Sequence, residues 1–272
     1  MKGAALKKWL PLLCAVLLLL TAAGCGGNTA PAAKDDSLQK VLDAGQLVLG
    51  LDVEYPPMGY IDESGEIVGF DIDMAQEVCN RLGITLVKQG IDWDEKENEL
   101  NSGKIDCIWS GMSVTPGRAE SMNLTDPYVK NELIFVVTGG SDVMGLRDLS
   151  GRTVGVQAGN TTVEAIEASE LYDDITVKIY DSGVELMQKL SQGEVDAVLV
   201  DSLNAYSFIQ SSDEQFYVLP DCISEEECAI GFRKADQALR DRVQEIISEM
   251  KADGTLGEIS RKWFGSDITI VK

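Results

Sequence analysis

The chain has 272 residues, of which 44% are hydrophobic and 25% charged, enough for one large domain or two smaller ones. The 45 acidic residues outnumber the 23 basic ones, and a net charge of −22 disfavours nucleic acid as a partner because phosphate backbones are repelled. The sequence has no histidine, which excludes Ser-His-Asp and Cys-His catalysis and most catalytic zinc sites. We therefore expect no cofactor and no metal.

The first two dozen residues have the plan of a secretory signal peptide. Three lysines and no acid precede an apolar run over residues 10–20, which is shorter than the roughly 20 residues of a bilayer span. Small residues then lead to Cys25 in a pattern that resembles a bacterial lipobox. We expect residues 1–24 to be a lipoprotein signal peptide and Cys25 to be lipidated. An ordinary signal peptide with an incidental cysteine is the alternative.

Residues 25–36 are small, polar and contain a proline, which is typical of a flexible tether. No later segment of the sequence is apolar enough to span a membrane. The sequence therefore predicts a protein anchored by lipid at the extracytoplasmic face of the bacterial cell membrane.

After the tether, short apolar strands alternate with amphipathic helices, and the same order occurs twice. The first half has predicted strands at 47–51, 84–87, 105–109 and 133–137 and helices at 70–82 and 96–101. The second half has strands at 153–156, 175–180 and 195–200 and helices at 161–168 and 184–190. A strand at 229–232 and helices at 235–250 and 255–263 follow. This alternation indicates an α/β protein.

The two halves also share a local pattern. Residues 102–110 (SGKIDCIWS) are similar to residues 192–200 (QGEVDAVLV), because in each a helix ends at glycine and a buried strand opens with Ile-Asp or Val-Asp. Alternating strands and helices imply parallel sheets covered on both faces. Two similar units imply two lobes with a cleft between them, and ligands bind beyond the carboxyl ends of such strands.

The C-terminal helices are expected to return to the first lobe. We therefore assign residues 37–130 and 226–272 to lobe 1 and residues 131–225 to lobe 2. The chain then crosses between the lobes twice, near residues 128–133 and 218–229. A hinge of two strands suits closure of the lobes like a clamshell.

Polar and aromatic side chains follow the ends of the predicted strands. Arg118 is suited to bind a carboxylate through two parallel hydrogen bonds, and Asp201 is suited to an ammonium group. Thr161 opens a helix, whose N-terminal end favours an anion. Tyr55 and Trp93 offer flat apolar walls. Together these residues predict a site for a free α-amino acid.

Each of these residues also has an ordinary structural explanation. Arg118 could form a surface ion pair, and Asp201 could cap a helix over residues 202–208. Tyr55 and Trp93 could belong to the core. Their coincidence at the strand ends of two paired lobes favours a binding site.

Four cysteines remain after cleavage and lipidation: Cys79, Cys107, Cys222 and Cys228. Export permits disulfides. Six residues of straight strand span about 20 Å, so a bond between Cys222 and Cys228 needs a turn between them. Buried free thiols are the alternative, and redox catalysis is disfavoured because there is no Cys-x-x-Cys motif.

Several stretches together resemble the bacterial extracellular solute-binding proteins of family 3, over residues 38–265. They include LVLGLDVEYPPMGY, EIVGFDIDMAQEVCNRLG, GKIDCIWSGMSVTPGRAESMNLTDPY, GRTVGVQAGNTT and MKADGTLGEISRKWFG. The resemblance implies a two-lobed periplasmic-binding-protein type II fold, the Venus-flytrap arrangement, with two crossover strands. It also implies a receptor without enzymatic activity that captures a free L-amino acid and delivers it to an ABC permease and its ATPase.

The resemblance assigns roles to residues at the predicted cleft. Asp52 and Tyr55 match pocket positions after the first strand, where the aromatic ring stacks on the ligand side chain. Trp93 falls where glutamine-binding relatives have a second aromatic wall. Gln157 lies at a variable position that tunes specificity.

Further matched positions concern the charged groups of the ligand. Ser110, Gly111 and Ser113 match a segment whose backbone and hydroxyl groups hold the amine and the carboxylate. Arg118 matches the arginine that binds the carboxylate, and Asp201 matches the aspartate that binds the amine.

Two departures from the family pattern are informative. Asn160 and Thr161 match a second carboxylate contact, but Asn160 replaces a usual threonine, which leaves its backbone N–H as the matched donor. Cys79 matches a disulfide cysteine of some relatives, yet its partner position is not cysteine, so that bridge is absent. The acidic residues near the pocket, which could equally be solvated surface, slightly favour a polar or cationic ligand; they are Asp52, Glu54, Asp92 and Asp94.

Two other functions compete with transport. Some secreted dehydratases resemble these binders and would need a general acid or base facing the substrate. An amino-acid sensor or adhesin could use the same fold. A monomer is the expected oligomeric state.

Overall fold

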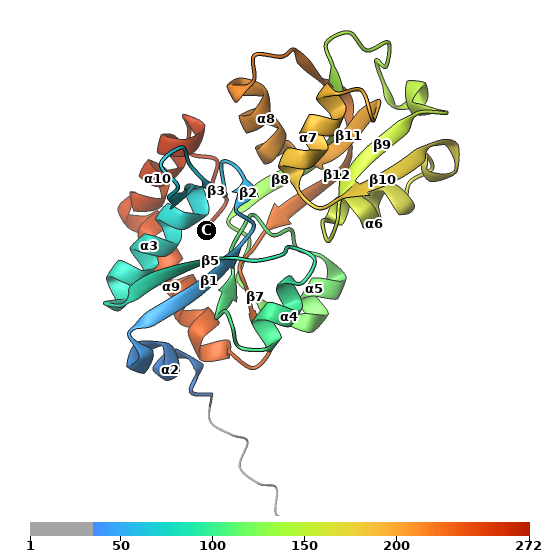
Figure 1. Ribbon diagram of the computed structural model, residues 1–272. Coiled ribbons are helices and arrows are strands. Elements are labelled where there is room, and N and C mark those ends of the chain that lie inside the picture. The colour runs from blue at the N-terminus through green and yellow to red at the C-terminus, as the bar shows by residue number, and fades with distance from the viewer. Residues whose placement is uncertain (1–34) are drawn as a thin grey trace, which may run out of the picture. The chain divides into compact units, whose positions relative to one another are not determined.

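Two five-stranded sheets organise residues 35–272, the part of the chain that the computed structural model describes (Figure 1). The predicted signal peptide at 1–24, the lipidated Cys25 and most of the predicted tether lie outside the described residues. The last tether residues are described, and Asp35 accepts hydrogen bonds from the backbone N–H groups of Ser37 and Ala238. Asp35 therefore already packs against the folded body.

The first sheet combines parallel and antiparallel strands. Its order is β5 (Thr85–Gly90), β1 (Gln46–Leu51), β6 (Cys107–Ile108), β13 (Gly231–Arg233) and β7 (Met122–Leu124). β1 is parallel to β5 and β6, whereas β13 is antiparallel to β6 and β7. The chain therefore returns to this sheet after it has completed the second one.

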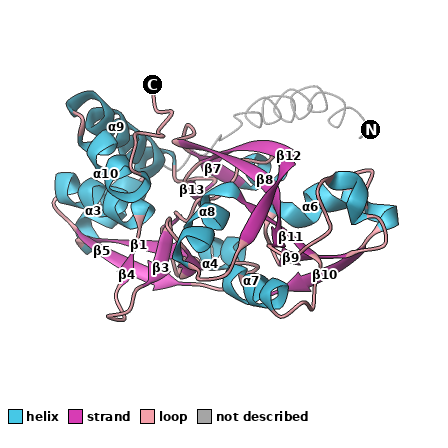
Figure 2. Cartoon of the chain, turned by 90° about the horizontal axis from the view of Figure 1, so that it is seen from above, coloured by secondary structure: helices cyan, strands magenta, loops and turns pink. Residues whose placement is uncertain are grey.

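Helices cover both faces of the first sheet (Figure 2). They are α2 (Ser37–Ala44), α3 (Phe70–Leu82), α4 (Lys96–Asn101), α5 (Pro116–Ser121), α9 (Gln237–Asp253) and α10 (Thr255–Phe264). Leu47 and Leu49 of β1 share a buried cluster with α3 and α9, while Val48 packs in a second cluster with Leu100 of α4. Because successive strand residues point to opposite faces, β1 is apolar on both sides.

The second sheet has the order β10 (Thr176–Tyr180), β9 (Thr153–Gln157), β11 (Ala197–Asp201), β8 (Val129–Thr138) and β12 (Phe216–Cys228). Its helices are α6 (Thr161–Glu167), α7 (Gly183–Ser191) and α8 (Ser202–Ser211), with short 3-10 turns η1 (Leu146–Leu149) and η2 (Tyr172–Asp174). α6 packs in the cluster on one face, and α7 and α8 pack in the cluster on the other. This sheet is also covered on both sides.

Two long antiparallel strands connect the sheets. β8 and β12 pair from Thr138 and Phe216 down to Val129 and Cys228, and Cys228 also bridges Ser113 of the first half. Figure 1 shows the two strands side by side, running from the second sheet toward the first. The crossings predicted near residues 128–133 and 218–229 are therefore confirmed.

Several short elements escape the sequence patterns. A three-stranded sheet of β2 (Glu54–Tyr55), β3 (Gly59–Ile61) and β4 (Ile67–Val68) follows β1, and its strands are too short to show a period. The strand predicted at 105–109 forms a ladder only at Cys107–Ile108. The carbonyl of Ile105 instead accepts a hydrogen bond of 2.6 Å from the Arg233 guanidinium.

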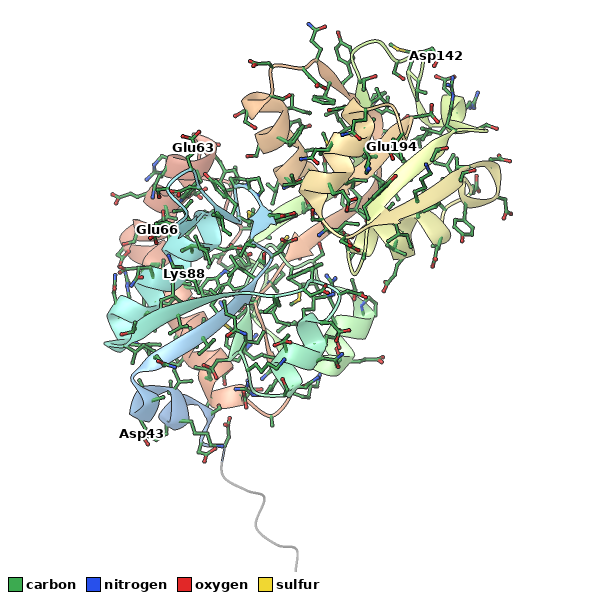
Figure 3. All side chains as sticks on the ribbon, in the orientation of Figure 1. Asp43, Glu63, Glu66, Lys88, Asp142 and Glu194 are labelled. Atoms are coloured by element: carbon green, nitrogen blue, oxygen red, sulfur yellow. The ribbon has the colours of Figure 1, made fainter. Side chains whose placement is uncertain are left out.

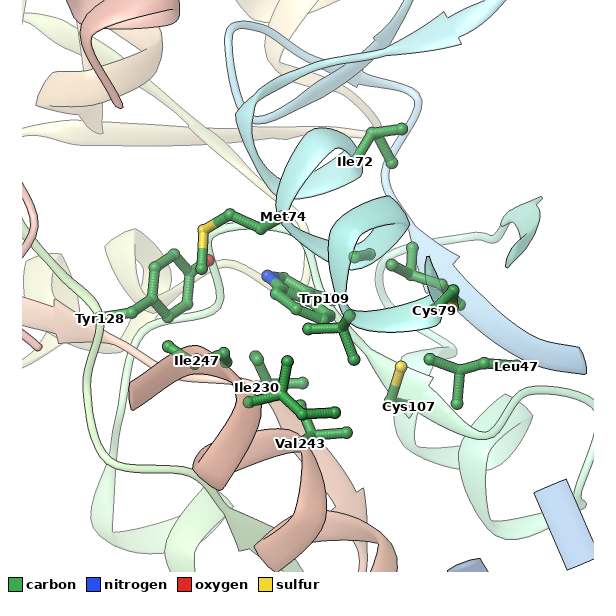
Figure 4. Close-up of a cluster of buried hydrophobic side chains, with 14 of the residues drawn as sticks. Leu47, Ile72, Met74, Cys79, Cys107, Trp109, Tyr128, Ile230, Val243 and Ile247 are labelled. Atoms are coloured by element: carbon green, nitrogen blue, oxygen red, sulfur yellow. The ribbon is translucent and has the colours of Figure 1, made fainter. Parts of the chain in front are cut away.

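The four described cysteines are free thiols. Cys222 and Cys228 both lie in β12, which contains register shifts but no turn between them. The geometric condition for a bond between them is therefore not met. Cys79 and Cys107 are buried in the cluster between α3 and the first sheet (Figure 4).

Charged side chains cover the outside of both halves. Figure 3 labels examples on several elements, including Asp43, Glu63, Asp142 and Glu194, all of which are exposed. Exposed positions on both halves therefore accommodate the excess of acidic residues. The few buried charged residues need a separate explanation.

The first sheet supplies a test of the assigned core. Leu49→Ala removes a fully buried side chain, so we expect the free energy of unfolding to fall by about 3 kcal/mol. Leu42→Ala, on α2 where the side chain is 36% exposed, should cost only about 0.5 kcal/mol. Urea unfolding followed by circular dichroism measures both, and equal losses would contradict the assigned core.

Candidate ligand-binding site

One cavity brings together all the residues that the sequence predicts to bind ligand. They come from the carboxyl ends of strands in both sheets and from the loops and helix starts that follow. Met112 lines the cavity as well and was not predicted. The complete lining is Asp52, Tyr55, Trp93, Ser110, Gly111, Met112, Ser113, Arg118, Gln157, Asn160, Thr161 and Asp201.

Arg118 is a buried cation without an acidic partner among residues 35–272. Its side chain is 9% exposed, and its guanidinium donates to the carbonyls of Ser113 at 2.8 Å and Gly159 at 3.1 Å. No carboxylate among residues 35–272 lies within 4 Å of it, so it is not part of a surface ion pair. Burial lowers its pKa, and the charges of Asp201 and Glu226 oppose that shift.

Asp201 has the opposite charge: it is a buried acid without a cationic partner among residues 35–272. It ends β11, is 3% exposed, and accepts hydrogen bonds from the side-chain amides of Asn131 and Asn160. No lysine or arginine within 35–272 comes within 4 Å of its oxygens, and its side chain does not cap α8. Burial raises its pKa, the Asn160 amide lowers it, and Glu226 raises it.

Asn160 uses both ends of its side chain inside the protein. Its amide nitrogen donates to Asp201 at 2.8 Å, and its oxygen caps α6 by accepting from the Thr162 N–H at 3.1 Å. Next to it, the Thr161 hydroxyl donates at 3.0 Å to Glu226, which belongs to β12. Asp201 is therefore not the only acid at this point, as Glu226 stands close to it.

Asp52 joins the two halves across the cavity. Its carboxylate accepts a hydrogen bond of 3.0 Å from the side-chain amide of Gln157, at the end of β9. The backbone N–H of Asp52 donates to the Ser110 hydroxyl at 3.2 Å. Burial raises the pKa of Asp52, while the Glu54 N–H and Gln157 lower it.

The two aromatic walls are both buried and in contact with the cavity. Tyr55 is 6% and Trp93 7% exposed, so each residue is part of the buried core and also lines the cavity. Burial holds the pKa of Tyr55 well above its ordinary value, so its hydroxyl stays protonated. The Tyr55 hydroxyl in turn lowers the pKa of Asp201.

Gly111 permits close packing of the loop against Tyr55. Its φ is +57°, and a Cβ added there would lie 2.8 Å from Cε1 of Tyr55. Any larger residue would displace the ring or the loop. The cavity wall at this point therefore requires glycine.

Direct hydrogen bonds close the cavity between the halves. Gly159 accepts from Lys96 Nζ at 2.9 Å as well as from Arg118, and the Asn204 amide donates to the Pro56 carbonyl at 3.0 Å. The enclosed free volume is about 10 Å³, roughly the space of one water molecule. A ligand larger than a water molecule therefore enters only when the two halves separate.

Comparison with known proteins identifies the family. The family described as "Bacterial extracellular solute-binding proteins, family 3" matches residues 47–266, which is most of the chain. The chain belongs to this family.

Two characterised relatives of this family-3 chain differ in the ligand that their names give. The arginine-binding extracellular protein ArtP of Bacillus subtilis is 31% identical over 95% of this chain and 98% of its own length. The L-cystine-binding protein TcyJ of Escherichia coli is 30% identical over 87% of this chain and 89% of its own length.

Solved structures show the same two-lobed fold. Tv2483 bound to L-arginine has a TM-score of 0.84 and 36% identity, covering 87% of this chain and 98% of its own. A substrate-binding protein from Streptococcus pneumoniae with bound histidine has a TM-score of 0.84 and 33% identity, covering 88% and 100%. An ancestral amino-acid-binding protein described as a precursor of cyclohexadienyl dehydratase has a TM-score of 0.77 and 29% identity, covering 84% and 99%.

The family-3 chain has no helix within residues 35–272 that combines the length and the apolar composition required to cross a membrane.

Three residues at the family-3 site are not marked by any sequence pattern: Lys96, Asn131 and Glu226. Lys96 stands in a run of acids, which is typical of a solvated helix, yet it is 6% exposed and its Nζ lies 5.0 Å from the centre of the Trp93 ring. Asn131 and Glu226 lie in the crossover strands, where the pattern indicates only a strand. Apart from the contact of Lys96 with Trp93, their partners are distant in sequence, so no spacing connects them.

The Lys96 contact leads to a test of closure. Lys96→Met keeps the apolar stem but removes the donor to Gly159, so we expect the ligand-free protein to open and its radius of gyration to increase. Lys104→Met, just beyond α4 where the side chain is 61% exposed, is the matched control and should change nothing. Small-angle X-ray scattering measures both variants, and identical profiles would contradict a closing role for Lys96.

Proposed function

We propose that the cavity binds a free L-α-amino acid and that the protein is the substrate-binding receptor of an amino-acid ABC importer. The observation that carries the proposal is the unpaired buried Arg118 and the unpaired buried Asp201 in one enclosed cavity. Buried charges without partners are costly, so a ligand with a carboxylate and an ammonium group supplies what each lacks.

Each lining residue that the sequence predicts has a role in this proposal. Arg118 and Thr161 bind the ligand carboxylate, Asp201 binds its amine, and Ser110, Gly111 and Ser113 contribute backbone and hydroxyl groups. Tyr55 and Trp93 enclose the ligand side chain, and Asp52, Gln157 and Asn160 complete the wall. The side-chain bonds of Asn160 to Asp201 and to α6 favour an indirect role for this residue.

We propose a cationic side chain for the ligand. Of the four acids considered from sequence, Asp52 alone lines the cavity, whereas Glu54, Asp92 and Asp94 are exposed. Glu226 adds a second carboxylate close to Asp201. With Arg118 engaged by the ligand carboxylate, the remaining charge at the site is negative, and the arginine-binding relative and structure are in keeping with this.

Delivery follows from closure around the ligand. We assign residues 37–130 with 226–272 to lobe 1 and residues 131–225 to lobe 2, with β8 and β12 as the hinge. The closed form would dock on a permease that works with an ATPase. We further propose a monomer anchored through lipid on Cys25, after removal of residues 1–24, at the extracytoplasmic face of the membrane.

Binding without turnover is favoured over a dehydratase reaction. An elimination needs a general acid or base free to reach the substrate. Both oxygens of Asp201 are engaged by amides, and both oxygens of Asp52 accept hydrogen bonds. These contacts suit carboxylates that bind a positive charge of the ligand, and not carboxylates that transfer a proton.

A ligand panel tests the function. The mature chain, stripped of ligand by unfolding and refolding, is heated with each of the common L-amino acids, ornithine and cystine. We expect arginine to raise the melting temperature, because a ligand at one hundred times its Kd adds about 2.7 kcal/mol of stability. Arg118→Ala should weaken binding about 100-fold, whereas Arg152→Ala, on an arginine of the second half that is 34% exposed and lies outside the cavity, should not. Absence of any shift across the panel would contradict the proposal.

The choice of side chain has its own test. Asp52→Asn preserves the shape and an acceptor for Gln157 but removes the charge. We expect arginine binding to weaken about tenfold and glutamine binding, if present, by less than about threefold. Isothermal titration calorimetry measures both, and equal losses would show that Asp52 does not select for a cation.

A further inference from the structure

A fully buried carboxylate lies directly behind the cavity. Asp71 is the second residue of α3 and is 0% exposed. Its Oδ2 accepts hydrogen bonds from the backbone N–H of Gly111 at 2.7 Å and from the hydroxyl of Tyr128 at 3.0 Å. Gly111 lines the cavity, whereas Asp71 and Tyr128 do not.

A third donor is present in the same buried space. The indole N–H of Trp109 and Oδ1 of Asp71 are both buried, and neither has a hydrogen-bond partner within residues 35–272. The Trp109 indole also lowers the pKa of Asp71. Figure 4 shows Trp109 and Tyr128 in one cluster below α3.

These donors come from three parts of the molecule that matter for binding. Gly111 belongs to the cavity loop, Trp109 leads from β6 into that loop, and Tyr128 immediately precedes the hinge strand β8. Asp71 therefore connects α3, the cavity loop and the start of the hinge through a single side chain.

The geometry favours the ionised carboxylate. A carboxylate only accepts hydrogen bonds, and both groups that bond to the Asp71 carboxylate within residues 35–272 are donors. The titratable groups nearest to it are Tyr128 and Cys228, both neutral because burial raises their pKa values. No cation among residues 35–272 pairs with it.

Keeping this charge buried lowers stability. Burial raises the pKa of Asp71 from 3.8 to about 7, against the effect of its three donors. Between these pH values the folded state holds a proton that the unfolded state has lost, so stability falls as pH rises through this window. Because the buried charge of Asp71 lowers stability at neutral pH and contacts the cavity loop, a role in positioning that loop would explain its presence.

We propose that Asp71 is a positioning residue for ligand binding, whose carboxylate holds Gly111 in the cavity wall and ties that wall to the start of the hinge through Tyr128. The wall position in turn places Tyr55, because an atom added at Gly111 would meet its ring at 2.8 Å. This inference rests on the proposed function for its effect on affinity, but the contact itself is measurable without ligand.

Two measurements test it. In protein labelled with 15N-glycine, the Gly111 amide resonance should shift with pH with a midpoint near 7, following the pKa of Asp71. The shift should vanish in Asp71→Asn. For affinity, Asp71→Asn should weaken binding of the preferred amino acid about tenfold and Tyr128→Phe about threefold. Asp73→Asn, on the same helix but bonded to Lys262 and Trp263, is the matched control and should bind normally.

The outcomes separate this inference from the proposed function. If no amino acid binds the wild type, the receptor function fails, while the titration of Gly111 still tests the Asp71 contact. A Gly111 resonance that is the same in Asp71→Asn as in the wild type at every pH would overturn the inference, as would unchanged affinity in both Asp71→Asn and Tyr128→Phe. Should Asp71→Asn not fold, the wild-type titration and Tyr128→Phe decide the matter.

Discussion

The arrangement of this protein depends on two opposite charges buried in one cavity without a partner inside the described chain. Arg118 is held by two carbonyls and Asp201 by two amides, all of them neutral groups. Neutral hydrogen bonds fix the positions of the charges but leave most of their desolvation cost uncompensated. In the proposed function, the carboxylate and the ammonium group of an amino acid would offset that cost, which makes these two groups the common element of recognition.

The topology of the two sheets places these charges in one cavity. Both sheets direct the carboxyl ends of their parallel strands to the same cavity, and β8 with β12 lets the halves separate without breaking either sheet. The buried residue Asp71, which lies behind the cavity, is fixed by hydrogen bonds as the lining residues are. The contacts of Asp71 with Gly111 and Tyr128 couple the wall to the hinge, so its proposed role connects packing to binding.

Sequence patterns identify the lining residues because strand ends are local features. Asp52, Gln157 and Asp201 each follow a run of buried strand residues, and the two similar halves bring those ends together. The patterns do not reveal the contacts of Lys96 with Gly159, of Glu226 with Thr161 or of Asp71 with Gly111, because the two residues of each contact lie 40 or more positions apart. The three-stranded sheet after β1 was also missed, since two or three residues carry no period.

The carbonyl of Gly159 has a further consequence for the evolution of ligand preference. It receives both Lys96 and Arg118 from the opposite half, and neither contact involves the side chain of a ligand. Part of the free energy of closure is therefore the same for every amino acid. Substitutions at cavity residues that make no contact between the halves can then change the preferred amino acid while both hydrogen bonds to Gly159 are kept.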